Sequence, residues 1–65
     1  MVELERTMDP IRLSVMRSVL TDADIEHYVF DTGAGAILQG VIPYRLMVRE
    51  GDLELARRAL SEAGL

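Results

Sequence analysis

The segment VELERTMDPIRLSVMRSVLTDADIEHYVFD, residues 2–31, predicts a strand, a helix and a second strand in that order. Val2–Thr7 largely alternates apolar and charged side chains, which is the period of a half-buried strand. Asp9 and Pro10 then form a typical helix start, because Asp accepts the first free N–H groups and Pro lacks a donor that would be missed there. Residues 25–31 resume the alternating pattern of a strand.

The helix that follows Asp9 has a wide apolar face. Six apolar residues cover about half of its circumference, which is more than contact with one sheet requires. Leu13 widens the face further, and its width predicts a second packing surface. The six residues are Ile11, Val15, Met16, Val19, Leu20 and Ala23. Asp24 is expected to take the left-handed conformation that ends this helix.

The remaining elements are a third strand at 44–49 and a helix that begins at Asp52. Gly64 and Leu65 have the residue types of a Schellman helix end. Alternation divides the side chains of the last two strands between two faces. In the second strand it places Ile25, His27 and Val29 on one face and Glu26, Tyr28 and Phe30 on the other, and in the third strand it separates Leu46 and Val48 from Arg45, Met47 and Arg49. Tyr28, Phe30 and Met47 would then share the open sheet face.

The order β-α-β-β-α predicts an α/β (α+β) two-layer, ferredoxin-like fold. One domain is expected over residues 1–65, with a three-stranded sheet and both helices on one face. If the third strand pairs with the first, Val2–Thr7 becomes an open edge, where Glu3 and Glu5 discourage further pairing or a second copy supplies another strand. Arg45 and Arg49 are then expected to meet those two glutamates across the sheet.

Composition excludes several functions. The net charge of −4 and seven scattered arginines disfavour nucleic-acid binding. The chain has no cysteine and His27 is its single histidine, so neither a metal site nor a Ser-His-Asp triad has its parts. No cofactor is expected. No apolar run approaches the ~18 residues of a membrane span, and the N-terminus lacks a signal-peptide pattern, so we expect a cytoplasmic protein.

A glycine-rich segment at residues 32–43 joins the second and third strands. At about twelve residues it is longer than the usual 2–5 residues of a hairpin loop, and long ordered loops often bind ligands. The run IPYRLMV, residues 42–48, ends the loop. With the opening strand, the Asp9-Pro10 helix start and the strand at 25–31, it resembles a family of very short bacterial domains described as putative prokaryotic signal transducing proteins. The resemblance covers nearly the whole chain. It implies a PII-like, ferredoxin-like fold and a small regulatory or binding domain, with no established enzyme activity to carry over.

Three hypotheses about the function are based on these residues. The leading hypothesis is a non-enzymatic regulatory or protein-interaction module, which binds an unknown protein or a second copy through the 32–43 loop and the open sheet face. The alternative is a sensor in which Arg45 and loop N–H groups hold a small anion. The candidate binding residues are Tyr28, Phe30, Asp31, Gly33, Gly35, Gly40, Pro43, Tyr44, Arg45 and Met47.

The third hypothesis concerns the stretch Asp31-Thr32-Gly33, which resembles the catalytic loop of aspartic proteases. In those enzymes two aspartates face each other and share a proton, and a homodimer would supply two copies of Asp31. However, the chain is too short for the strands and the flap of such a protease. We therefore expect no enzymatic activity.

Overall fold

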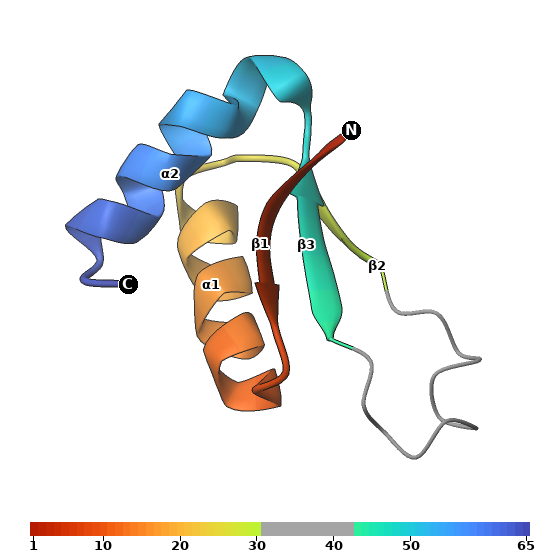
Figure 1. Ribbon diagram of the computed structural model, residues 1–65. Helices are drawn as coiled ribbons and strands as arrows, with labels where there is room; N and C mark the ends of the chain where they lie inside the picture. Colours follow the sequence, from red (N-terminus) through yellow and green to blue (C-terminus); the bar gives the residue numbers. More distant parts are fainter. Residues whose placement is uncertain (31–42) are drawn as a thin grey trace.

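The computed structural model describes residues 1–30 and 43–65. These residues form a three-stranded sheet with two helices packed on one of its faces (Figure 1). In chain order the elements are β1 (Val2–Thr7), α1 (Pro10–Asp22), β2 (His27–Phe30), β3 (Tyr44–Val48), a 3₁₀ turn η2 (Glu50–Asp52) and α2 (Leu53–Glu62). The expected two-layer, ferredoxin-like β-α-β-β-α arrangement is therefore confirmed.

The strand order in the sheet is β1-β3-β2. β3 is antiparallel to both neighbours, so β1 and β2 run in the same direction with β3 between them. This is a split β-α-β unit, in which α1 connects two strands that are parallel but not adjacent. Among the described residues, β1 and β2 are both sheet edges.

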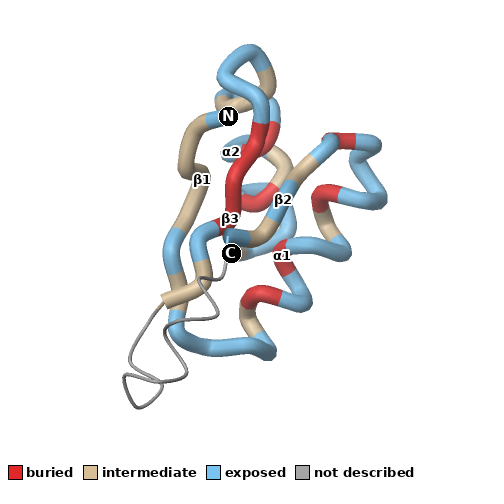
Figure 2. The backbone as a smooth tube through the Cα atoms, turned by 90° about the vertical axis from the view of Figure 1, so that its right-hand side faces the viewer, coloured by how far each residue is buried: buried red, intermediate tan, exposed pale blue. Residues whose placement is uncertain are grey.

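The core lies between the sheet and the helices. Figure 2 shows the buried positions along β3 and on one side of α1. Leu46 and Val48 of β3 are fully buried, as alternation predicted. The buried cluster consists of Leu13, Met16, Leu20, Ile25, Leu46, Val48, Ala56 and Leu60.

The predicted buried face of α1 is partly wrong. Leu13, Met16 and Leu20 are its buried residues, at spacings of three and four. Ile11, at one margin of the predicted face, is 74% exposed, and Val15 is exposed as well. The apolar residues extend over so much of α1 that periodicity alone could not locate the centre of the buried side.

Both helices end in a Schellman motif. At α1, Asp24 N–H donates to the Thr21 carbonyl (3.0 Å) and Ile25 N–H to the Leu20 carbonyl (2.8 Å), while Asp24 has the expected left-handed φ of 60°. At α2, Gly64 has a φ of 82° and Leu65 N–H donates to the Leu60 carbonyl at 2.9 Å. Ile25 belongs to the first of these turns, so β2 begins two residues later than predicted.

The pairing of β1 with β3 contains an irregularity between Glu3 and Glu5. Glu3 lies opposite Met47, but Glu5 lies opposite the buried Leu46, so Glu5 points to the helix side. There its Oε2 accepts a hydrogen bond from Arg12 Nε of α1 at 2.9 Å. The predicted meeting of Glu3 with Arg45 is confirmed, whereas the predicted role of Glu5 is wrong because one extra residue moves it to the other face. Arg49 pairs with Glu26 instead.

Candidate functional site: the open sheet face

The face of the sheet that points away from the helices is the candidate site. Two rows cross it, because directly opposed residues share a face. Glu3, Met47 and Tyr28 form one row, and Arg6, Arg45 and Phe30 form the next. Together with the ion pair at the end of the sheet, the open face comprises Glu3, Arg6, Glu26, Tyr28, Phe30, Arg45, Met47 and Arg49.

The apolar part of the open face lies on the β2 side. Tyr28 is 53% exposed and Phe30 is 55% exposed, and the two side chains are neighbours on the same face of β2. Met47 beside them is only 8% exposed, although it is not a member of the core cluster. Large aromatic side chains that remain half-exposed next to each other are typical of contact surfaces.

The charged groups of the open face compensate one another. Arg45 Nε donates to Glu3 Oε1 at 2.8 Å, and Arg6 Nη2 donates to the same oxygen at 3.0 Å. These bonds, with Arg45 as the larger contributor, lower the pKa of Glu3 below its ordinary value. The carboxylate therefore stays ionised and holds both arginines over the sheet.

A second pair of contacts fixes the edge next to Tyr28. The Tyr28 hydroxyl donates to Glu26 Oε1 at 2.9 Å, and this bond raises the pKa of Tyr28. The other Glu26 oxygen pairs with Arg49. The phenol is thus kept protonated, and its ring presents an apolar surface with a polar tip.

The structure brings four of the predicted site residues together on this face: Tyr28, Phe30, Arg45 and Met47. Tyr44 instead lies opposite Thr7 and packs against the core from the helix side. Pro43 is half-buried directly before β3. The predicted contributions of Asp31, Gly33, Gly35 and Gly40 lie outside the described residues.

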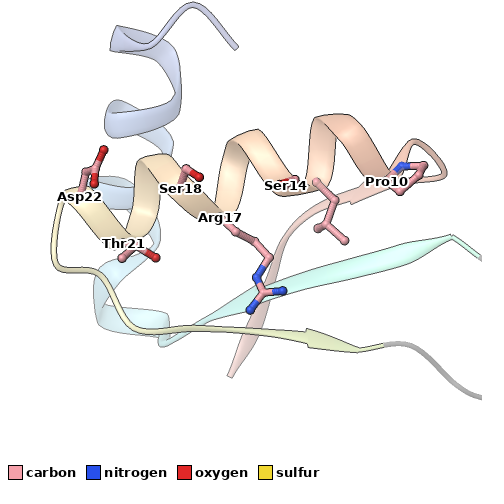
Figure 3. A pocket seen from close by; sticks show the side chains of 7 residues that line it. Pro10, Ser14, Arg17, Ser18, Thr21 and Asp22 are labelled. Atoms are coloured by element: carbon pink, nitrogen blue, oxygen red, sulfur yellow. The ribbon is translucent and has the colours of Figure 1, made fainter.

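A feature that sequence reasoning did not single out is a polar groove along α1, on the side that faces the outer edge of β2 (Figure 3). It has a volume of about 480 Å³ and is lined by Pro10, Leu13, Ser14, Arg17, Ser18, Thr21 and Asp22. Arg17 points from α1 toward the sheet (Figure 3). A second groove of about 560 Å³ shares Arg17 and Thr21 and reaches His27. The spacing of Ser14, Ser18 and Thr21 along one helix flank was the available signal.

In residues 1–30 and 43–65, no group of three or more His, Cys, Asp or Glu side chains could hold a metal ion. None of the helices described is long and apolar enough to cross a membrane.

Comparison with known proteins adds one result. No curated protein and no solved structure matches the chain. A family model does match, and it covers residues 1–64. The chain therefore belongs to the family described as "Putative prokaryotic signal transducing protein".

Proposed function

We propose that this domain is a non-enzymatic protein-interaction module in signal transduction, and that its open face binds a partner protein. The observation that carries the proposal is the pair Tyr28 and Phe30, half-exposed side by side on a sheet face that no described element covers. Aromatic side chains supply much of the binding energy at protein interfaces. The family description agrees with a signalling role.

The ion pairs around these aromatics fit the same proposal. Arg45 and Arg6 are held by Glu3, so their side chains lose little further freedom when a partner covers them. Such pairs at the rim of an interface contribute to orientation and partner choice more than to affinity. The face thus has an apolar region on its β2 side with charged residues beside it, and interfaces commonly combine apolar and charged regions in this way.

Anion sensing through Arg45 is less well supported by the described residues. Arg45 already donates to Glu3 at 2.8 Å, and an incoming anion would have to replace that carboxylate or share the arginine with it. An anion sensor and a protein-interaction module can be distinguished by their binding of phosphate. A sensor predicts that Glu3→Gln strengthens the binding of inorganic phosphate, measured by NMR titration, whereas an interaction module predicts no saturable phosphate binding.

The proposal can be tested by site-specific photo-crosslinking in the cells from which the protein comes. A photoreactive phenylalanine analogue replaces Tyr28 in one variant and Leu55 in the other. Leu55 is the matched control, because it is also 53% exposed but lies on α2. We expect from position 28 a discrete adduct with another protein, distinct in mass from two cross-linked copies of this chain, and none from position 55. Equal adducts at both positions, or no adduct at position 28, would refute the proposed function.

A further inference from the structure

The two edges of the sheet differ in how they are protected against further pairing. β1 contains the irregularity at Glu3–Glu5, and two charged side chains of this strand, Glu3 and Arg6, bond to each other. Bulges and charges on an edge strand are two of the usual devices that prevent pairing with another chain. β2 has neither, because its four residues, HYVF, keep a regular register with β3 and include no Asp, Glu, Lys or Arg.

We propose that two copies of this chain pair antiparallel along β2, with Val29 on the two-fold axis, to form one six-stranded sheet. A second copy is favoured as the partner of β2 because the strand is complementary to itself. An antiparallel pair keeps both open faces on the same side when a residue lies on the two-fold axis, and the two registers centred inside β2 place Tyr28 opposite the partner's Phe30 or opposite its own equivalent. With Val29 on the axis, each Tyr28 lies opposite the partner's Phe30, which gives two aromatic cross-strand pairs.

The other register is less favourable. If Tyr28 lay opposite its own equivalent, each Phe30 would lie opposite the partner's Glu26. That carboxylate is already engaged by Arg49 and by the Tyr28 hydroxyl, and it offers the phenyl ring no apolar contact. The self-pairing therefore has a preferred register, which a dimer of symmetric type requires.

The helix layer leaves room for this arrangement. The flank of α1 that faces the outer side of β2 carries Ser14, Ser18 and Thr21 together with Arg17, and the groove of about 480 Å³ runs along it (Figure 3). Leu13, which also lines the groove, is buried, so a second copy that approaches β2 meets short polar side chains and Arg17 on this flank. The dimer would also place both open faces on the same side of one sheet, so that the aromatic residues of the two copies form one continuous row.

The first test is the concentration dependence of mass, measured by analytical ultracentrifugation. The wild-type chain is expected to change reversibly from monomer to dimer. Phe30→Arg is expected to weaken the dimer by at least about tenfold, because it removes the aromatic ring from both cross-strand pairs and places a charge in each of them. Leu55→Arg is the matched control on α2 and should leave the dissociation constant unchanged. A monomer at every concentration, or a dimer that Phe30→Arg does not weaken, would overturn the proposal.

The second test determines the register, and it is free of background because the chain contains no cysteine. Val29→Cys should form a disulfide-linked dimer on mild oxidation, since the two copies of this position lie opposite each other. Glu3→Cys, on the β1 edge, should not. Efficient linkage through position 3 instead of position 29 would overturn the proposal. The dimer and the proposed function can fail separately. A chain that stays monomeric but still forms an adduct with another protein at position 28 would refute the dimer and support the proposed function.

Discussion

Replacement of Asp24 by glycine should stabilise the domain. Asp24 is exposed, ends α1 and has a φ of 60°, where an L-residue costs roughly 1–2 kcal/mol relative to glycine and Asp, which tolerates this region better than most, is expected at the lower bound. Its carboxylate also lies at the negative end of the helix dipole, which costs about 0.3–1 kcal/mol. Glycine loses about 0.4–1 kcal/mol through the greater freedom of its unfolded chain. The net gain expected for Asp24→Gly is about 1 kcal/mol, or roughly 4–8 °C in Tm for a domain of this size.

Thermal and urea unfolding followed by circular dichroism measure this gain, and two further variants separate its sources. Asp24→Asn removes the charge but keeps a side chain that tolerates the left-handed region, so it should recover only the dipole part. Gly64→Ala makes the reverse change at the same position of the motif in α2, where φ is 82°, and should cost about 1 kcal/mol. If Asp24→Gly were no more stable than Asp24→Asn, backbone strain at Asp24 would be ruled out as the source of the gain.

Three further predictions concern the core, the helix cap and the ion pairs. Met16→Ala should lower the free energy of unfolding by about 2–5 kcal/mol because Met16 is fully buried. In urea unfolding this is about half of the roughly 3–10 kcal/mol expected for a domain of 65 residues, whereas Ile11→Ala should change little. Asp9→Ala should cost about 1 kcal/mol in the same assay, since Asp9 Oδ1 accepts the Ile11 N–H at 2.9 Å. The lowered pKa of Glu3 contributes stability that is present above its unfolded value, near 4.5, and is lost as the pH falls below it. The urea concentration at the midpoint of unfolding should therefore decrease less between neutral and acidic pH in Glu3→Gln than in the wild type. If the decrease were the same in both, Glu3 would be excluded as its source.

Local chemistry explains which parts of the fold could be predicted. The helix start at Asp9 and both helix ends depend on residues within one turn, so they could be read from the chain directly. The alternation of β2 and β3 placed Tyr28, Phe30 and Met47 on one face, and this succeeded because the register between these two strands is regular. Tyr44 shares the face of Leu46 by the same rule, but its place at the end of the loop had suggested a binding role.

The irregularity in β1 could not be predicted from its pattern. The sequence VELERT has the same alternation whether the strand is regular or contains a bulge, and the bulge becomes visible only in the pairing with β3. Its consequence is large, because Glu5 moves from the predicted open face to the helix side and bonds to Arg12. The orientation of α1 escaped prediction for a related reason, since its apolar residues fit more than one rotation and only the packing selects Leu13 over Ile11.

Charge does not decide between the two sides of the molecule, so the choice of contact surface depends on its apolar groups. The open face has three arginines and two glutamates, a net charge of +1. The helices are also close to neutral, because α1 contains two arginines and one aspartate and α2 contains two arginines and two glutamates. Neither side should therefore strongly repel a second copy. Tyr28 and Phe30 are half-exposed on a strand edge without charged residues, and these aromatic side chains favour the sheet as the interface.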